Sequence, residues 1–310
     1  MTGPRTPIRE EPSREWEHYN LWVNVKEALY NLPYQFHTDT YIEGVSLTDL
    51  PTLSPAVGTT IEQQLVDNLN QIRSVWDPEG RYSEYAFIRQ AQTFPDVLLT
   101  KSGGGDITPI LGIELKTWYL LAKEKEPNFR FCATKEACAP ADLVVIVPWL
   151  LSQVISGRPK LLKPFVENAR YVAAWRNYYW EHTRQTEDDR GIIVPEDVRP
   201  YPRKSDAIND RPVSDRGKNF GRIARTGIME EYIEEIYNER IAGIEIRHWL
   251  RFVKIFSEGR TREEIEQEFE RFEREIEQGR YGKNEGKIES VWMILTGLRR
   301  LIWEESGTDS

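Results

Sequence analysis

The stretch FPDVLLTKSGGGDITPILGIELKTW, residues 94–118, decides how the chain folds. It consists of two apolar runs joined by a triple glycine, which is the pattern of two strands and the turn between them. Three charged side chains lie within these runs: Asp96, Glu114 and Lys116. A charge in a buried strand is costly unless it is paired, so we expect the three side chains to act together.

Strand geometry predicts where these side chains point. Residues two apart on a strand face the same side, so Glu114 and Lys116 project together. With the turn centred near Gly104, Asp96 falls opposite residues 113–114 of the second strand. Because Mg²⁺ is commonly held by one or two carboxylates together with substrate phosphate, the pattern predicts a magnesium site. A lysine beside the ion can orient or deprotonate a water.

The neighbouring segments predict alternating helices and strands. A threonine cap and apolar residues at helical spacing indicate a helix over residues 59–76. Residues 83–92 have the pattern of a strand, and residues 130–142 that of a short helix. The uncharged apolar run over residues 143–149 is typical of a strand buried on both faces. This order predicts an α/β fold; the family resemblance given below implies that its central sheet is mixed and flanked by helices.

Outside this block the chain is predicted to be mainly helical. An N-terminal helix is expected over residues 14–32, followed by a loop rich in Thr, Ser and Pro over residues 38–58. The remaining helices are predicted over residues 161–182, 227–242, 244–257, 261–278 and 287–304. The predicted units are an N-terminal helix and loop extension (1–58), a core (59–150) and a large, mainly helical C-terminal part (151–310).

Pro95-Asp96 followed by Glu114-Leu115-Lys116 resembles the signature of the PD-(D/E)xK nuclease superfamily. The order of elements in the core block is also similar to that superfamily, and the long additional segments make the chain most similar to Type II restriction endonucleases. The resemblance implies a restriction-endonuclease-like core and Mg²⁺-dependent cleavage of double-stranded DNA. It implies that Asp96, Glu114 and the Leu115 carbonyl hold the metal, and that Lys116 positions the attacking water.

The family resemblance and the residues themselves leave several choices open. The helix before the strands often supplies a further acidic residue to such sites, which points to Glu62 and, as a second choice, to Asp67. Either can instead be a solvated charge on a helix face. Asp106 in the glycine turn competes with Asp96, although aspartate is common in turns for conformational reasons. The motif as a whole has a structural alternative, an ion pair between Glu114 and Lys116 on an exposed sheet face.

Charge placement predicts which segment approaches DNA. The net charge of −9 argues against nucleic-acid binding by bulk charge. Residues 199–226, the basic window, hold eight basic and three acidic side chains, so the window is +5 and the remainder is −14. Its glycines allow close approach to phosphate, and a solvated loop is the alternative. The predicted DNA contacts are Lys204, Arg216, Lys218, Asn219, Arg222 and Arg225.

Composition narrows the class of protein further. Two cysteines are too few for a disulfide framework or a four-ligand zinc site, and the four histidines are scattered. The charged N-terminus has no apolar signal region, and the longest apolar run is too short to span a membrane. We therefore expect a cytoplasmic protein without a membrane partner. Palindromic DNA sites favour a homodimer.

Two other functions fit the same pattern. A repair or recombination nuclease would read DNA structure rather than sequence. A catalytically idle DNA-binding protein would keep the fold without the reaction. The large C-terminal half argues against the first, and the intact set of Asp, Glu and Lys argues against the second.

Overall fold

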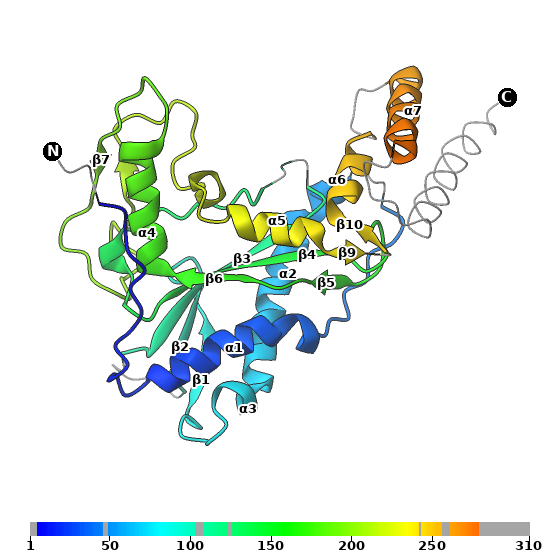
Figure 1. Ribbon diagram of the computed structural model, residues 1–310. Coiled ribbons are helices and arrows are strands. Elements are labelled where there is room, and N and C mark those ends of the chain that lie inside the picture. The colour runs from blue at the N-terminus through cyan, green and yellow to red at the C-terminus, as the bar shows by residue number, and fades with distance from the viewer. Residues whose placement is uncertain are drawn as a thin grey trace.

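A computed structural model of the chain describes residues 5–45, 49–102, 108–122, 124, 126–241, 243–255 and 261–278. Its helices are α1 (Tyr19–Gln35), α2 (Leu50–Gln71), α3 (Arg73–Trp76), α4 (Ala169–Tyr178), α5 (Glu230–Asn238), α6 (Ile246–Ile255) and α7 (Arg262–Glu277), with helical turns η1 (Lys135–Ala137), η2 (Tyr179–Thr183) and η3 (Ile223–Thr226). Its strands are β1 (Tyr85–Arg89), β2 (Val97–Lys101), β3 (Leu111–Tyr119), β4 (Leu143–Leu151), β5 (Pro159–Leu161), β6 (Phe165–Asn168), β7 (Ile192–Ile193), β8 (Arg211–Pro212), β9 (Arg240–Ile241) and β10 (Ile244–Glu245). Figure 1 shows helices on both sides of a twisted, mixed sheet, so the predicted α/β class is confirmed.

The central sheet has the strand order β1-β2-β3-β4-β5, and β6 also pairs with β4. β1, β2 and β3 are antiparallel neighbours, whereas β3 and β4 run parallel. β5 and β6 pair antiparallel with opposite ends of β4. β4 is therefore enclosed by strands on both edges, and all of its residues are buried, as the uncharged run predicted.

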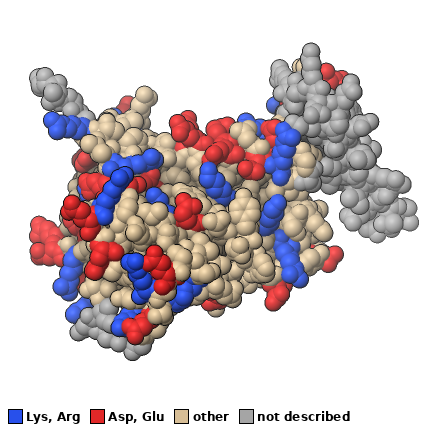
Figure 2. Space-filling model, turned by 60° about the horizontal axis from the view of Figure 1, so that its bottom comes forward, with Lys and Arg blue, Asp and Glu red and all other residues tan. Residues whose placement is uncertain are grey.

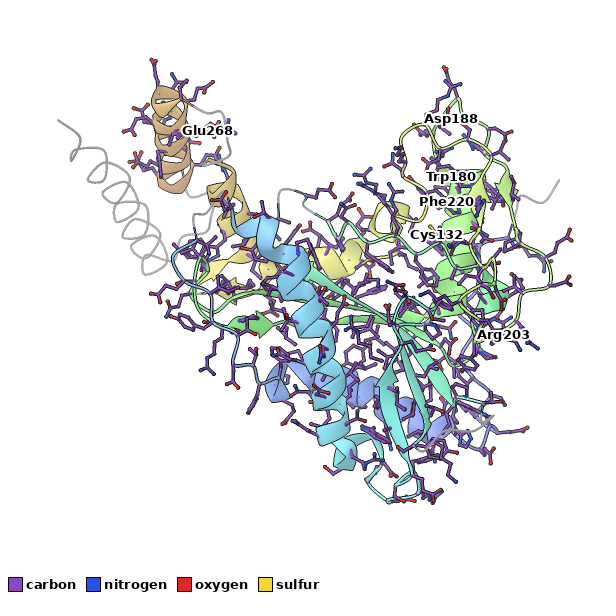
Figure 3. The ribbon with its side chains drawn as sticks, turned by 180° about the vertical axis from the view of Figure 1, so that it is seen from behind. Cys132, Trp180, Asp188, Arg203, Phe220 and Glu268 are labelled. Carbon is purple, nitrogen blue, oxygen red and sulfur yellow. The ribbon has the colours of Figure 1, made fainter. Side chains whose placement is uncertain are left out.

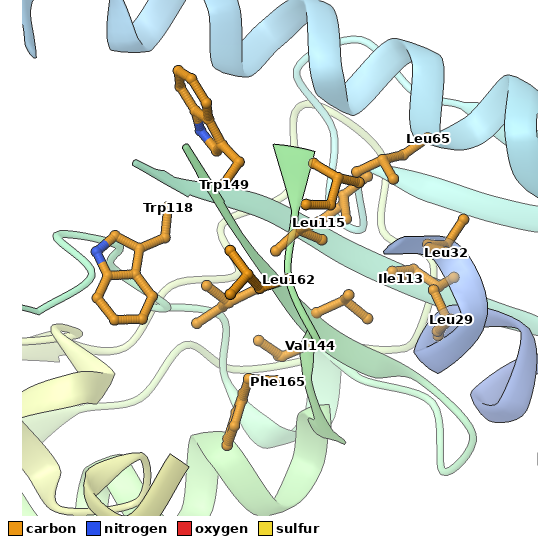
Figure 4. Close-up of a cluster of buried hydrophobic side chains, with 14 of the residues drawn as sticks. Leu29, Leu32, Leu65, Ile113, Leu115, Trp118, Val144, Trp149, Leu162 and Phe165 are labelled. Carbon is orange, nitrogen blue, oxygen red and sulfur yellow. The ribbon is translucent and has the colours of Figure 1, made fainter. Parts of the chain in front are cut away.

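β3 contributes to the core on both of its faces (Figure 4). Ile113 and Leu115 lie toward the leucines of α1 and α2, and Trp118 lies on the opposite side. The ring centroid of Trp118 is 6.0 Å from that of Tyr237 in α5. The sheet is thus packed between α1 and α2 on one face and α5 on the other, and β3 runs through the centre of the core.

Two glycines let neighbouring segments approach β3 closely. A Cβ at Gly58 of α2 would lie 2.5 Å from Thr117 Oγ1, a separation that real Cβ atoms do not show. A Cβ at Gly112 would collide with the ring of Pro95. Glycine at these positions brings the middle of α2 and the turn before β2 directly against β3.

α2 begins earlier than predicted. Leu50 starts the helix inside the stretch expected to be a loop, and α2 runs across the boundary drawn between residues 58 and 59. The prolines that suggested a loop lie in its first two turns, and the N–H missing from Pro51 has no intrahelical acceptor there. Thr59, the predicted cap, lies inside the helix and donates from Oγ1 to the Pro55 carbonyl at 3.0 Å.

The sheet continues past residue 150, the predicted end of the core. The single helix expected over residues 161–182 is wrong in its first part, because β5 ends and β6 lies within that range. α4 starts only after Asn168, whose Oδ1 accepts a hydrogen bond from the Tyr171 N–H at 3.1 Å. Residues 165–168 pair with β4 as strand β6, so the helix begins only after them.

The C-terminal part is less helical than predicted. Residues 184–229 form mostly irregular loops, with β7, β8 and η3 among them. α5 ends at Asn238 and a β9-β10 hairpin follows, in place of the single helix expected over residues 227–242. α6 and α7 match the next two predicted helices. The helix predicted over residues 287–304 lies outside the described residues.

Candidate active site

The edge of β3 is open beside the predicted site. β2 pairs with β3 only through residues 111–113, whereas β3 continues along β4 to Tyr119. From Glu114 onward, the edge of β3 that faces away from β4 has no strand partner in the described chain. The Leu115 N–H on this edge donates instead to Asp96 Oδ2 at 3.1 Å, so the backbone itself helps to position the first carboxylate.

Asp96, Glu114 and Lys116 converge, as the strand register predicts. Val97 is paired with Ile113, so extending the register by one residue places Asp96 opposite Glu114. Lys116 Nζ lies 2.8 Å from Asp96 Oδ2 and 3.5 Å from Glu114 Oε1. The side chain of Glu114 is 13% exposed, while Asp96 and Lys116 are 29% and 31% exposed. The cluster is therefore accessible from solvent but not freely hydrated.

Carboxylates outnumber ammonium groups in this cluster. Burial and, next, the charge of Asp96 raise the pKa of Glu114 to about 8, and Lys116 offsets only part of this effect. Burial also raises the pKa of Glu62, with Lys116 acting against it and Asp96 adding to it. Neighbouring buried carboxylates shift in this direction because each disfavours ionisation of the other. Near neutral pH Glu114 therefore retains a proton that a bound cation could replace.

Lys116 keeps its positive charge. Burial acts to lower its pKa, but Glu114 and Asp96 outweigh burial and raise the pKa of Lys116 to about 12. The ammonium therefore donates hydrogen bonds and is unsuited to accept a proton, so orienting a water fits it better than deprotonating one. Its Nζ also lies 5.8 Å from the centroid of the Phe129 ring.

The donor set fits a hard divalent cation. Asp96 and Glu114 offer carboxylate oxygens, and Glu62 lines the same cavity as Lys116. Among the described residues, no group of three or more His, Cys, Asp or Glu side chains is close enough to hold a metal alone. Mg²⁺ often binds one or two carboxylates and takes its other ligands from water and substrate, and two carboxylates at an open edge meet that requirement.

The other residues predicted as metal ligands differ in where they lie. Asp67 is exposed and does not line the cavity, so Glu62 is the acidic residue that α2 brings to the site. Asp106 lies outside the described residues. Metal binding by the Leu115 carbonyl stays a prediction.

Part of the basic window lies beside the same cavity. Arg222 Nη1 is 3.6 Å from Glu124 Oε2, and Arg225 Nε is 2.5 Å from Glu126 Oε1. Both glutamates line the cavity that contains Lys116. Arg225 also donates to Asn219 Oδ1, and the Lys218 carbonyl accepts from Arg130. Two of the predicted DNA contacts are therefore neutralised by acidic residues next to the candidate site.

The remaining two of the six predicted DNA contacts, Lys204 and Arg216, lie elsewhere on the loops. Lys204 Nζ donates to Gln92 Oε1 at 2.8 Å. Arg216 is 88% exposed, with Nε 3.4 Å from Asp188 Oδ1. Figure 3 places Asp188 and Arg203, the chain neighbour of Lys204, at opposite ends of the loop region beside α4. On the face in Figure 2, basic and acidic side chains are interspersed and form no single basic patch.

A buried ion pair anchors these loops. Arg176 in α4 pairs with Asp210, and their side chains are 1% and 0% exposed. Arg176 Nη1 also donates to the carbonyls of Phe131 and Ala133, at 2.7 and 3.1 Å. Its guanidinium lies 4.9 Å from the Phe220 ring centroid, in the cluster beside α4 shown in Figure 3. These contacts therefore fix the basic window to the segment that contains Phe131 and Ala133, which directly follows the loop that lines the cavity.

Some residues around the site carry no signal in the sequence. Asn128, Phe129 and Arg130 follow β3 in a loop and form one wall of the cavity. Arg89 ends β1 opposite Val97, and its charge lowers the pKa of Glu62 against the larger effect of burial. Loop residues of these types have no characteristic spacing, so only the alternating glutamates nearby could have drawn attention to this segment.

No protein-family model, curated protein or solved structure matches this chain. The chemistry of the site is therefore inferred from its own residues. Within the described part of the chain, no helix combines the length and apolar character that crossing a membrane requires.

Proposed function

We propose that this chain is a nuclease of the PD-(D/E)xK type that hydrolyses DNA phosphodiester bonds with Mg²⁺. The observation that carries the proposal is the excess of carboxylate over ammonium at the open edge of β3, where Asp96 and Glu114 share Lys116 and Glu62 lines the same cavity. A structural ion pair balances its charges. This cluster has a carboxylate left over for a cation that could in turn bind an anionic substrate.

Each side chain has a distinct role in this proposal. Asp96 and Glu114 would hold Mg²⁺, which when bound would lower the pKa of the attacking water and offset charge on the phosphate. Lys116 donates a hydrogen bond that orients the attacking water or a phosphate oxygen. Glu62 adds a carboxylate oxygen from the α2 side. Water attacks phosphorus in line and the bond to the 3′ oxygen breaks, which leaves 5′-phosphate and 3′-hydroxyl ends.

Cleavage of supercoiled plasmid DNA in MgCl₂ tests the proposal. The protein should cut with Mg²⁺, stop with EDTA, and bind without cutting in CaCl₂. Glu114→Gln should remove cleavage but retain DNA binding, because it removes a metal ligand and a negative charge. Glu167→Gln is the matched control, since the Glu167 side chain is 12% exposed, against 13% for Glu114, and also pairs with a basic residue.

The products distinguish three classes of function. Discrete fragments indicate sequence-specific cleavage as in restriction, for which we propose a homodimer on two-fold symmetric sites. Random degradation indicates a nuclease that reads DNA structure. A mobility shift without cleavage indicates a DNA-binding protein that lacks the reaction. Cleavage that survives Glu114→Gln contradicts the assignment of the site.

A further inference from the structure

A cavity of about 660 Å³ opens beside Lys116. Its floor is the unpaired edge of β3, from Lys116 to Tyr119. One wall is α2, through Ser54 and Glu62, and the opposite wall is the loop that ends at Arg130. A group bound in this cavity therefore lies next to any group that the Lys116 ammonium contacts.

The lining combines an aromatic ring with polar groups that lack partners. Trp118 and Tyr119 are 3% and 4% exposed, and neither the indole Nε1 nor the phenol oxygen has a hydrogen-bond partner. The Phe129 ring is half-buried and the Asn128 amide is exposed. These two groups belong to consecutive strand residues, whose side chains point to opposite faces, so the ring that the cavity offers to a flat group is that of Phe129.

The charged groups of the cavity are mixed in sign. Glu62, Glu124 and Glu126 line it, and so do Lys116 and Arg130. Glu124 Oε2 is buried without a hydrogen bond, because Arg222 Nη1 at 3.6 Å is too far to donate one. The carboxylate oxygens therefore favour an occupant that donates hydrogen bonds.

We propose that this cavity binds one nucleobase, that of the nucleotide next to the phosphate presented to Lys116. The proposal rests on the proposed function, since a nucleic-acid substrate delivers the base. A volume of about 660 Å³ lies in the range of small-ligand sites, and unstacked bases are typically held by an aromatic face and hydrogen bonds to their edges. A base within a duplex cannot enter a concave site, so this base leaves its stack.

The same chemistry selects among the bases. A carboxylate can accept a hydrogen bond from an exocyclic amino group, as Glu and Asp do from cytosine N4. Adenine, cytosine and guanine carry such a group with two N–H donors, whereas thymine offers only its single ring N3–H. The site should therefore prefer a base with an amino group, with Phe129 against its face and Glu124 at its edge.

Calorimetric titration with dAMP, dCMP, dGMP, TMP and deoxyribose 5-phosphate in CaCl₂ tests the proposal. At least one amino-bearing nucleotide should bind about tenfold or more tightly than deoxyribose 5-phosphate, the scale expected of base–aromatic stacking. TMP should bind more weakly than that nucleotide. Phe129→Leu should remove the advantage, because it fills the volume without a ring, and Phe129→Tyr should retain it. Phe36→Leu is the control, since Phe36 is half-buried and does not line the cavity.

Two results overturn the base site. One is equal binding of all four nucleotides and deoxyribose 5-phosphate, and the other is an advantage that Phe129→Leu leaves unchanged. Plasmid cleavage by the same preparation separates this failure from a failure of the proposed function. Cleavage without base preference rejects only the base site, whereas base preference without Mg²⁺-dependent cleavage rejects only the nuclease.

Discussion

Among the clusters of cation and carboxylate in the described part of the chain, two are built in opposite ways. Arg176 and Asp210 form one buried pair, and Arg176 also donates from Nη1 to two backbone carbonyls and from Nε to Asn177 Oδ1. Lys116 instead lies between Asp96 and Glu114 at an open strand edge, with about a third of its side chain exposed. The first cluster pairs one cation with one carboxylate, whereas the second has one more carboxyl group than it has cations.

The difference indicates that the first cluster is structural, and it supports the proposal that the second binds a cation. Distances alone do not separate them, because both contain close cation–carboxylate contacts. A third carboxylate, Asp142, sharpens the contrast: it is buried and accepts from the N–H groups of Gly112 and Ala139 and from the Tyr201 hydroxyl, at 2.6, 2.7 and 3.2 Å. Asp142 thus accepts three hydrogen bonds from uncharged donors, whereas Glu114 shares one ammonium with Asp96.

The largest expected effect is on catalysis at the unbalanced cluster. Lys116→Met should lower plasmid cleavage about a thousandfold or more, since such a loss is typical when a group that stabilises the transition state is removed. The fold should survive, because a partly exposed ion pair contributes little stability. Activity and circular dichroism measured on one preparation check both halves. A protein that unfolds while its folded fraction keeps normal specific activity would make this cluster structural.

The next effect is on stability at the balanced cluster. Arg176→Met should destabilise the protein by about 3–5 kcal/mol, because it leaves Asp210 buried without its cation. The double change Arg176→Met with Asp210→Leu should recover part of this loss. Urea unfolding measures both, with Arg216→Met as the exposed control. Equal stability of Arg176→Met and the parent would show that the pair does not anchor the loops.

A pH-dependent effect is expected at Asp142. Burial raises its pKa to about 6, above the usual value of 3.8, so the folded state holds this proton more tightly than the unfolded chain. The contribution of Asp142 to stability therefore falls as pH rises between these two values. From pH 4.5 to 7.5 the fall should be about 2 kcal/mol. Asp142→Asn removes this term, so its destabilising effect should be larger at pH 4.5. An effect that grows toward pH 7.5 would reverse the sign argued here.

The smallest effect concerns the arginines neutralised beside the cavity. Glu124→Gln with Glu126→Gln frees Arg222 and Arg225 for phosphate, so affinity for duplex DNA should rise by about three- to tenfold, with a steeper salt dependence. Arg222→Ala and Arg225→Ala should weaken binding and flatten that dependence. Glu268→Gln on α7 is the control, since Glu268 also pairs with an arginine. Identical salt slopes for all variants would place DNA contact elsewhere.

Patterns that span a few residues predicted the convergence of the three charged side chains, but they did not predict all of the elements around them. Asp96, Glu114 and Lys116 follow from the two-residue period of strands and the register of one hairpin. β6 was missed because pairing with β4 makes it a strand, and the sequence around Pro164 does not show that pairing. The Arg176–Asp210 contact joins α4 to the loop before β8, so no sequence pattern could reveal it.

The most direct test of the central claim, that the excess carboxylate beside Lys116 binds a divalent cation, is a titration with Mn²⁺ followed by electron paramagnetic resonance. The parent protein should bind at least one Mn²⁺ that Mg²⁺ displaces. Asp96→Asn should lose that ion, while Asp206→Asn, which changes an exposed carboxylate, should bind as the parent does. Equal Mn²⁺ binding by Asp96→Asn and the parent, or no binding by the parent, would contradict the account.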